Sequence, residues 1–591
     1  MLVLYAMMAC RPSEGDDKVG DDTSCELVEA CADADGDGWG GDDCDSFCEV
    51  PDGYTTELGD CDDTDRGIKP DRWFEACDGV DEDCDGEIDE APVDGGTLFY
   101  RDDDDDGWGI PDDEVEACDQ PEGYVELVGD CDDTNAHIHP DEDEVCGNGV
   151  DEDCDGADWC PIDPSDVYVA APAERDQLGT ALAAADLDGD GQHDLIVGAD
   201  DHDAGGDAAG AAFLLAGPLT AARNASAAEA TVLGASESDG LGGALAVVGD
   251  VDGDGLVDWA VGAPGSDAGG EGAGALYLLG GLATGLEGAS TVLGMQTDWG
   301  VGGSAGWVGD LDGDGRDDLG VGATGAHYDS VQGGALFLFF EPPSGATNTW
   351  YADANLYAVE HNVHVGFAYA GVGDLDGDGL DDLAIGAPYD QNEGIYAGAL
   401  FLVNGPVSGD VAVDRDGTTV AESDYDELGV AVASTGDLDG DGLADLVVGA
   451  RGYDDGAGAV YVLLGPVTDG DLSAARAKAV GEAGSATGGD VAPGDYDGDG
   501  ELDLLIAAQN DSYGGDSSGA AYVLYGPLSG SYELALGTDK VISGEAWTYT
   551  GRSVANAGDH DGDGVDEALV GATGATPSGQ PEGGAAWLFS F

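Results

Sequence analysis

The sequence predicts an all-β fold built from repeats of one short, four-stranded unit. Short alternating apolar runs separated by Gly/Asp clusters dominate the chain, a pattern typical of strands joined by tight turns. The apolar spacing of amphipathic helices is nearly absent, and 103 of the 591 residues are glycine. One acidic motif also recurs seven times from residue 165 onward.

The chain is strongly acidic, with 127 acidic against 15 basic residues and a formal net charge of −112. Such a charge repels nucleic acid and anionic lipid headgroups, so neither is an expected partner. Apolar residues make up 42% of the chain, enough to bury a core, so this is no disordered acidic tail. A surface adapted to solubility or high salt would explain scattered acids, but not acids at fixed spacing.

Residues 1–10 form an apolar segment that ends in Ala9 and Cys10 and resembles a bacterial lipoprotein signal, followed by a linker over residues 11–30. Cys10 would then carry a lipid anchor. The segment is short and lacks Lys and Arg, so a plain export signal and a chance apolar start remain alternatives. Because no run of 18 apolar residues occurs, we expect no membrane span and a secreted or cell-surface location.

Residues 31–92 and 100–160 repeat each other, and all 13 cysteines lie in residues 1–160. Dense, even cysteine content in an exported region implies disulfides. Four cysteines per repeat correspond, which suggests two bridges within each repeat, with the connectivity left open. The corresponding pairs are Cys48 and Cys118, Cys61 and Cys131, Cys77 and Cys146, and Cys84 and Cys154.

Alternating aspartates in these two repeats predict metal-binding loops, because a tight loop turns such side chains toward one side, as calcium loops do. Metal and disulfides would here replace a hydrophobic core. The candidate ligands are Asp33, Asp35, Asp37, Asp81, Asp83, Asp85 and Asp89 in the first repeat, and Asp102, Asp104, Asp106, Asp151, Asp153 and Asp155 in the second. The repeats resemble the Cys/Asp-rich metal-binding repeats of bacterial surface proteins and thrombospondin type 3 calcium repeats, without specifying the metal.

His137 and His139 would suit a softer metal such as copper. The first repeat has Gly67 and Lys69 at these places, which favours a solvated loop.

The recurring motif of residues 165–591 is Asp-x-Asp-Gly-Asp-Gly-x-x-Asp. Calcium binds about seven oxygens in a flexible shell; here positions 1, 3, 5 and 9 would supply carboxylates and position 7 a backbone carbonyl. The candidate ligands are Asp186, Asp188, Asp190, Gln192 and Asp194; Asp250, Asp252, Asp254, Leu256 and Asp258; Asp310, Asp312, Asp314, Arg316 and Asp318; Asp374, Asp376, Asp378, Leu380 and Asp382; Asp437, Asp439, Asp441, Leu443 and Asp445; Asp495, Asp497, Asp499, Glu501 and Asp503; and Asp559, Asp561, Asp563, Val565 and Glu567.

The motif shares its opening with the EF-hand loop, but an EF-hand also needs a Glu at position 12 and flanking helices. Position 12 is Val or Ile in every copy. A calcium β-roll would need contiguous repeats. Turn formation alone would account for one loop, whereas seven loops that keep acids at positions 1, 3, 5 and 9 favour calcium. The sixth copy is the least regular, with Ala507 and Ala508 where others have Gly-Ala.

Each repeat carries four strand signals around its loop. Seven such repeats predict a seven-bladed β-propeller with four-stranded blades. The chain ends in the third strand of the last blade, over residues 584–591, and residues 166–170 would supply its fourth strand and close the ring.

These segments resemble the FG-GAP repeat of the integrin α-subunit propeller, with Leu241-Gly242 or Val365-Gly366 in place of Phe-Gly and Gly262 to Pro264 as the second half. The resemblance covers residues 165–591. It implies a seven-bladed propeller with calcium in hairpin loops on one face. Integrins load only some of their blades, whereas this chain has the motif in all seven, so the motif itself predicts about seven Ca²⁺ ions in the propeller and allows more in the N-terminal repeats.

The sequence therefore predicts a calcium-binding adhesion or binding scaffold for a protein or glycan partner, and no enzyme. A calcium-stabilised polysaccharide lyase or hydrolase and a structural envelope component stay open. The stretch Gly302 to Gly306 fits a nucleophile elbow without its strand-turn-helix context, and residues 360–364 lack the zincin order. Trp299, Trp307, Tyr328 and Trp350 would suit a glycan site, but core packing explains them equally well.

Overall fold

The computed structural model describes residues 26–591 except 74, 90–92, 105, 141, 143–153, 155–158, 162–166, 252, 284, 329, 392–393, 414–417, 468–469, 513–514, 535–539 and 578–581. The chain divides into two compact units, one of Met1–Glu142 with Glu152–Cys154 and one of Asp143–Asp151 with Asp155–Phe591. No helix among the described residues has the length and apolar character needed to cross a bilayer. The predicted lipid anchor, Cys10, lies outside the described residues.

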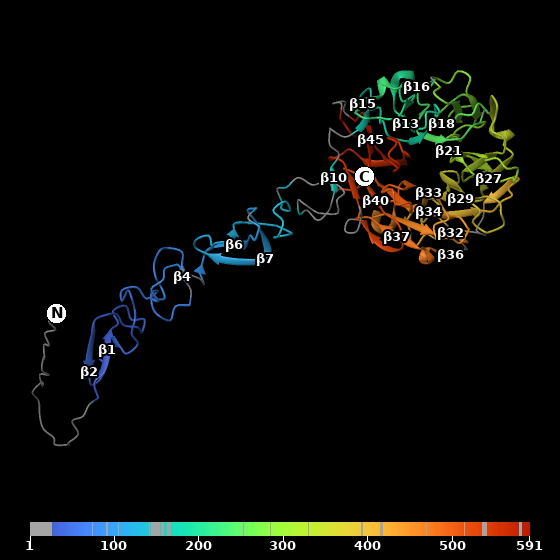
Figure 1. Cartoon of the computed structure of the whole chain (residues 1–591). Helices are drawn as coiled ribbons and strands as arrows, with labels where there is room; N and C mark the ends of the chain where they lie inside the picture. The colour runs from blue at the N-terminus through green and yellow to red at the C-terminus, as the bar shows by residue number, and fades with distance from the viewer. Residues whose placement is uncertain are drawn as a thin grey trace, which may run out of the picture. The chain divides into compact units, whose positions relative to one another are not determined.

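The second unit is a β-propeller whose described strands form seven sheets, the blades, around a common centre (Figure 1). In hydrogen-bonded order, the first blade contains β12 (Leu182–Ala185), β13 (Asp194–Ala199), β14 (Ala211–Leu215) and β16 (Ala230–Leu233). The second contains β17 (Ala244–Val247), β18 (Asp258–Ala263), β19 (Ala275–Gly280), β20 (Ser290–Leu293) and β26 (Ala346–Asn348). The third contains β21 (Ser304–Trp307), β22 (Leu319–Ala323), β25 (Ala335–Phe339), β27 (Ala354–Ala358) and β31 (Gly409–Val413).

The fourth blade contains β28 (Ala368–Gly373), β29 (Asp382–Ala387), β30 (Ala399–Val403), β32 (Thr418–Val420) and β36 (Gly470–Asp471). The fifth contains β33 (Leu428–Gly436), β34 (Asp445–Ala450), β35 (Ala459–Leu463), β37 (Ala477–Val480) and β41 (Gly530–Glu533). The sixth contains β38 (Val491–Gly494), β39 (Asp503–Ala508), β40 (Ala520–Leu524), β42 (Lys540–Ser543) and β10 (Trp159–Pro161). The seventh contains β43 (Thr550–Asn556), β44 (Ala568–Ala572), β45 (Ala585–Phe589), β11 (Val167–Ala170) and β15 (Arg223–Asn224).

Smaller elements lie in the connections between these strands. They are the hairpin β23 (His327–Tyr328) and β24 (Val331–Gln332), the single helical turn α1 (Tyr453–Gly456), and the 3-10 turns η1 (Asp203–Gly205), η2 (Ala225–Ala227), η3 (Thr349–Tyr351) and η4 (Leu472–Ala474).

The ring closes on itself. The first strands contact one another in turn, from β12 through β17, β21, β28, β33 and β38 to β43, and β43 contacts β12. Strand β11 pairs antiparallel with β45, so the segment before the first blade completes the last one, as the sequence predicted. His560, which is buried, adds a link: its Nε2 accepts the Leu219 N–H at 2.6 Å and its Nδ1 donates to the His193 carbonyl at 2.6 Å.

The prediction of four strands per blade holds for the first blade and is exceeded in the other six. There a fifth, parallel strand pairs with the outermost strand of the blade, as β26 does with β20 and β41 does with β37. An unpaired strand edge exposes a row of free N–H and C=O groups. The fifth strands, each only two to five residues long, cover that edge.

Successive blades approach so closely at one contact that six of the seven blades have glycine there. A Cβ on Gly262 in β18 would lie 1.9 Å from the carbonyl oxygen of Gly302 in the next blade, and one on Gly198 in β13 would lie 2.0 Å from that of Gly242. The equivalent residue of the sixth blade is Ala507, which is fully buried. The glycines of the repeat therefore serve the packing between blades.

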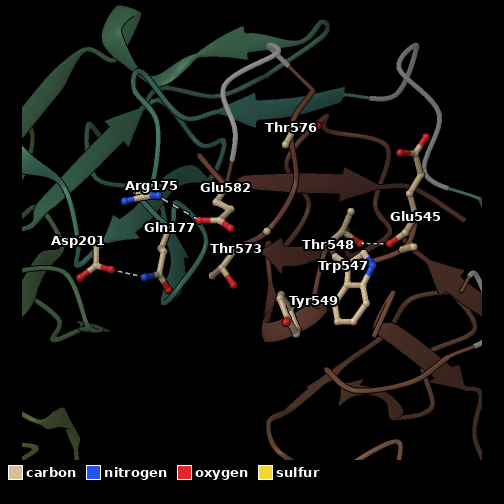
Figure 2. Close-up of a pocket in the computed structure, with 12 residues that line it drawn as sticks. Arg175, Gln177, Asp201, Glu545, Trp547, Thr548, Tyr549, Thr573, Thr576 and Glu582 are labelled. Carbon is tan, nitrogen blue, oxygen red and sulfur yellow. Dashed lines mark hydrogen bonds and ion pairs between the residues drawn. The ribbon is translucent and has the colours of Figure 1, made fainter. Parts of the chain in front are cut away.

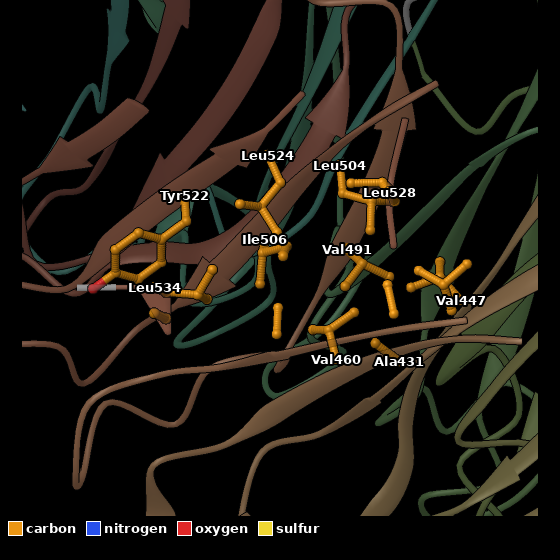
Figure 3. Packing of buried hydrophobic residues seen from close by; sticks show 14 of the residues in the cluster. Ala431, Val447, Val460, Val491, Leu504, Ile506, Tyr522, Leu524, Leu528 and Leu534 are labelled. Atoms are coloured by element: carbon orange, nitrogen blue, oxygen red, sulfur yellow. The ribbon is translucent and has the colours of Figure 1, made fainter. Parts of the chain in front are cut away.

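Apolar side chains fill the space between blades. Figure 3 shows one such cluster, in which Val447 and Val460 of the fifth blade face Val491 and Ile506 of the sixth. Position 12 of each loop motif belongs to these cores: Val197, Val261, Val321, Ile385, Val448, Ile506 and Val570 are all fully buried. The residue that an EF-hand uses as a ligand is a core residue here.

The first unit consists of small sheets joined by loops. Its strands are β1 (Val28–Ala32), β2 (Cys44–Phe47) and β3 (Tyr54–Thr55); β4 (Glu75–Ala76) and β5 (Val93–Asp94); and β6 (Thr97–Arg101), β7 (Trp108–Ala117), β8 (Tyr124–Val125) and β9 (Leu127–Val128). Its described disulfides are Cys31–Cys44, Cys61–Cys84, Cys77–Cys118 and Cys131–Cys154.

The disulfides confirm one expectation and correct another. Cys61–Cys84 and Cys131–Cys154 are equivalent bridges within the two repeats, as expected. Cys77–Cys118, however, joins the first repeat to the second, so the bridges are not all internal to a repeat. Cysteines that correspond in sequence need not share a partner, because pairing depends on which side chains lie adjacent after folding.

We expect Gly262→Ala to lower the free energy of unfolding by about 2 kcal/mol or more, because the added methyl group overlaps the Gly302 carbonyl. The matched control is Ala507→Gly, at the equivalent position where a methyl group already fits; it should cost no more than about 1 kcal/mol. Thermal unfolding of the two variants would measure both effects. Equal losses would show that this contact does not limit blade packing.

Candidate metal centres

Each propeller loop curls around the carboxylate of its first aspartate. Asp186 Oδ1 accepts the N–H groups of Gly189 at 2.7 Å and Asp190 at 3.1 Å, and Oδ2 accepts that of Gly191 at 3.0 Å. Asp250, Asp310, Asp374 and Asp437 repeat the same three bonds. These hydrogen bonds fix the turn and set the direction in which the remaining oxygens point.

The residue at position 7 closes the curl in all seven loops. Its backbone N–H donates to the carboxylate at position 5, as Gln192 does to Asp190 at 2.9 Å. The same hydrogen bond is donated in the other loops by the backbone N–H groups of Leu256, Arg316, Leu380, Leu443, Glu501 and Val565. In the third loop the Arg316 side chain also bonds Asp314 at 2.9 Å and Glu341 at 3.2 Å, so a protein cation already lies beside that loop.

The carboxylate at position 9 is buried in every blade and lies at or just before the start of the second strand. In the first blade, Asp194 Oδ2 accepts the Leu187 N–H at 3.0 Å and Oδ1 accepts the Gly217 N–H at 2.9 Å. One side chain thus ties the loop, the second strand and the turn after the third strand together. Asp382, Asp445 and Asp503 do the same in the fourth, fifth and sixth blades.

These buried carboxylates carry a charge that the protein alone does not offset. Burial, with neighbouring carboxylates as a further cause, raises the pKa of Asp318 and Glu567 to about 7. The pKa of Asp503 is raised to about 6, again mainly by burial. Asp318 Oδ1 is buried without a hydrogen-bond partner. A bound cation would satisfy both the charge and the unused lone pairs.

The carboxylate oxygens converge in each kind of loop. One oxygen each from Asp186, Asp188 and Asp194, or from Asp310, Asp312 and Asp318, lies within 4.8 Å of the others. In the first unit, the groups that converge in this way are Asp33, Asp35 and Asp37; Asp81, Asp83 and Asp85; and Asp102, Asp104 and Asp106. Donor sets made only of oxygens favour hard cations such as Ca²⁺ over copper or zinc.

Some predicted ligands are placed elsewhere or not described. Asp89 Oδ1 accepts the N–H groups of Asp78 at 3.2 Å and Gly79 at 3.0 Å, so Asp89 bonds the backbone that precedes the predicted loop. Asp151, Asp153, Asp155 and Asp252 lie outside the described residues.

Two aspartates that the motif spacing did not single out lie buried beside the aspartate loops of the first unit. Asp60 and Asp130, which correspond in the two repeats, are 6% and 1% exposed. The Oδ2 atom of each is buried without a hydrogen-bond partner. The same is true of Asp35 and Asp104, the middle residues of the adjacent aspartate loops. The identical set of unused oxygens thus occurs in both repeats.

The carboxylates of the aspartate loops affect the ionisation of Asp60 and Asp130. The pKa of Asp60 is raised mainly by burial and further by the carboxylates of Asp37 and Asp35; the pKa of Asp130 is raised by burial and by Asp106 and Asp104. In the sequence, the repeated Gly-Asp-Cys triplet was the feature that could have indicated these two aspartates. Its cysteine indicated only the disulfides.

Lys69 could also neutralise the cluster of the first repeat, because its Nζ lies 3.8 Å from Asp37 Oδ2. The second repeat has His139 at that place. His139 contacts Glu142 at 3.2 Å and stacks on Trp108, while His137 is 82% exposed. A lysine therefore does not account for the aspartate cluster in both repeats.

The motifs that suggested enzymes have structural roles. Ser304 lies within β21, and its hydroxyl donates to the Gly366 carbonyl at 2.7 Å. His361 accepts the Gln332 N–H at 3.1 Å, and the ring of His364 packs against Tyr389. Within the described residues, neither motif forms a catalytic arrangement.

We expect Asp60→Asn and Asp130→Asn each to remove one bound divalent cation or to weaken its binding about tenfold or more, because the number of charged ligands sets the affinity of such sites. The exposed residue Asp119 gives a control, Asp119→Asn, with the same change in net charge. Equilibrium dialysis against Ca²⁺ would count the ions. An unchanged count in both variants would exclude the two aspartates as ligands.

We expect cation removal to destabilise the protein more at pH 8 than at pH 5. Unfolded carboxyls have a pKa of about 4, whereas Asp318 and Glu567 have a pKa of about 7 in the folded chain. The metal-free folded state therefore takes up protons between these values, and its stability falls as the pH rises through them. Calorimetric melting of metal-free and metal-loaded protein at both pH values would measure the difference.

The variant Asp318→Asn supplies the matched test, because it removes the buried charge and keeps the shape. It should raise the melting temperature of the metal-free protein at pH 8 and reduce the gain on adding metal. A metal effect that is the same at both pH values would contradict the electrostatic origin of the instability.

Comparisons with known proteins agree with this geometry. The FG-GAP repeat model matches residues 178–215, 241–279 and 370–401, and the FG-GAP-like repeat model matches residues 437–506. A metal-binding motif of the Cu-binding MopE type matches residues 60–90 and 130–158, so both of its ranges begin at the buried aspartates Asp60 and Asp130.

Curated relatives share part of the chain. Integrin alpha-X of Homo sapiens is 32% identical over 148 residues, which are 24% of this chain and 12% of the integrin. Integrin alpha-5 of Xenopus laevis is 33% identical over 156 residues, 24% of this chain and 14% of the integrin. Phosphatidylinositol-glycan-specific phospholipase D of Rattus norvegicus is 34% identical over 155 residues, 24% of this chain and 18% of the enzyme.

The matched region thus spans less than a fifth of each of these relatives, and their activities are not transferred to this chain. The matched repeats, the β-propeller and the carboxylate loops agree on one family assignment. The chain is an FG-GAP repeat protein with metal-binding motifs in its N-terminal region.

Proposed function

We propose that this protein is a calcium-binding adhesion or binding scaffold at the cell surface or in secreted form. One observation carries the proposal: the same oxygen-only cradle recurs in loop after loop of both units, and several of these loops hold buried carboxylate oxygens that have no hydrogen-bond partner. Calcium suits such cradles because it accepts six to eight oxygen ligands in irregular geometry. Four disulfides in the first unit support an oxidising, extracellular location.

The metal loops support a structural role for calcium. In the propeller they join the first and second strands of each blade, whereas the connections between second and third strands lie at the opposite end of the same antiparallel strands. Calcium bound on one face would hold the blades rigid and leave the other face free for a partner. Rigid scaffolds with variable loops are a common way to build binding surfaces.

We expect Ca²⁺ at millimolar concentration to raise the melting temperature of the chelated full-length chain more than Mg²⁺ does, since Mg²⁺ requires an octahedral shell and dehydrates reluctantly. Cu²⁺ serves as a further comparison because of the MopE-type match. Equal stabilisation by Mg²⁺, or selective stabilisation by Cu²⁺, would refute the calcium assignment.

The binding role needs a separate measurement. Immobilised extracellular proteins and glycans should retain the calcium-loaded chain and release it on chelation. Retention that is unaffected by chelation would contradict a calcium-stabilised scaffold, and no retention by any surface would favour a purely structural role.

A further inference from the structure

A cleft of about 580 Å³ lies between the seventh and the first blade (Figure 2). It is lined by Trp547, Tyr549 and Thr573 from the seventh-blade side and by Arg175, Gln177 and Asp201 from the first-blade side. These residues come from the connections β42–β43, β44–β45, β11–β12 and β13–β14. Antiparallel strands alternate in direction, so these connections lie on the face opposite the metal loops.

The connection that leads into each blade has one repeated backbone geometry. The residues three and one before the start of the Leu-Gly, Val-Gly or Thr-Gly pair have positive φ in all seven blades. In the first six blades these residues are Arg175 and Gln177, Ser238 and Gly240, Asp298 and Gly300, Asn362 and His364, Tyr425 and Glu427, and Gly484 and Ala486. In the seventh blade they are Trp547, with φ of 68°, and Tyr549, with φ of 52°.

Aromatic residues at both of these positions occur only in the seventh of these seven turns. Positive φ is rare for bulky side chains and costs about 1 kcal/mol or more at each residue. Trp547 is 58% and Tyr549 36% exposed, so both rings keep exposed surface on which a ligand can pack. The turn geometry is architectural, whereas the two exposed rings are particular to this blade.

The turn is held in place by polar contacts. The Trp547 N–H donates to the Asp516 carbonyl at 3.0 Å, and the Thr548 hydroxyl contacts the carbonyls of Ser518 at 2.7 Å and Glu545 at 2.8 Å. The Gly574 N–H donates to the Thr548 carbonyl at 2.9 Å. The two aromatic rings are therefore presented on a well-anchored segment, which lowers the entropy lost on binding.

The size and polarity of the cleft fit a small, hydroxyl-rich ligand. Its volume falls within the range of small-molecule sites, about 300–1,000 Å³. An adjoining hollow of about 220 Å³ shares Glu545, Thr548 and Thr576 with it, which gives room for a second unit of an extended ligand. The carboxylates and hydroxyls of the lining can bond sugar hydroxyls, and the rings of Trp547 and Tyr549 can cover the C–H face of a pyranose.

Charge restricts the ligand further. The lining carries the carboxylates of Asp201, Glu545 and Glu582 against one cation, Arg175, which lies 3.7 Å from Glu582. Gln177 bonds Asp201, as Figure 2 shows. In a chain of net charge −112, this cleft would repel uronic acids and other anionic sugars.

We propose that this cleft binds a neutral oligosaccharide, stacked on Trp547 and Tyr549. The proposal rests on the scaffold function above, for which it names the ligand class and the place of binding.

The test uses the calcium-loaded full chain and isothermal titration with neutral oligosaccharides of two to four gluco-, galacto- or manno-pyranose units, and with uronic acid oligomers of the same length. At least one neutral series should bind. Trp547→Ala and Tyr549→Ala should each weaken binding at least tenfold, and Trp547→Phe should retain part of it. Trp73 of the first unit, which is 83% exposed and does not line the cleft, gives the control Trp73→Ala, which should bind as the parent does.

Melting temperatures of all four variants would show that they remain folded. Absence of binding by every neutral series, binding of uronic acid oligomers alone, or a loss in Trp73→Ala and not in Trp547→Ala would each overturn the proposal. Calcium-dependent retention on immobilised proteins would survive such a result, so failure of the cleft is distinguishable from failure of the scaffold function.

Discussion

The buried carboxylate at position 9 of each loop is the constraint on which the propeller depends. In four blades it accepts backbone N–H groups from the loop on one side and from the turn after the third strand on the other. A neutral residue could make some of these bonds, but only an anion combines them with an attraction for a cation. Burying such a charge is costly unless it is paired, so each blade is built around an electrostatic cost that a bound cation would relieve.

A second constraint acts between blades. The second strand of one blade meets the first strand of the next at Gly262 and Gly302, where even a methyl group would overlap a carbonyl oxygen. The carboxylate anchors the loop end of the second strand, and the glycine sets how closely that strand approaches its neighbour. Together they let the ring close with first strands in mutual contact and with β11 completing the seventh blade.

These constraints separate the two faces of the propeller. The metal loops need the same chemistry in every blade to hold the ring, which leaves little freedom for variation on that face. The opposite connections share only a backbone geometry, with positive φ at two positions, and their side chains differ from blade to blade. Binding specificity can therefore arise in one blade, such as the seventh with Trp547 and Tyr549, without disturbing the metal loops.

The first unit reaches the same chemistry without a large core. Its aspartate loops use the hydrogen bonds of the propeller loops: Asp33 Oδ1 accepts the N–H groups of Gly36 at 2.7 Å and Asp37 at 3.1 Å. Disulfides take the place of blade packing. In both units a buried carboxylate lies beside each loop of alternating aspartates: the residue at position 9 in the propeller, and Asp60 or Asp130 in the first unit.

The sequence by itself determined the features that depend on neighbouring residues. The loops follow from the spacing of Asp and Gly, the strands from apolar alternation, and the closing strand from the incomplete last repeat, because each is encoded within a few residues or by the period of the repeat. Only the tertiary structure decided the fifth strands, the Cys77–Cys118 bridge, the position of Asp60 and Asp130 beside the aspartate loops, and the meeting of Trp547 and Tyr549 with Arg175 and Asp201 in one cleft. Each of these depends on which segments, distant in sequence, lie side by side after folding, and no local pattern carries that information.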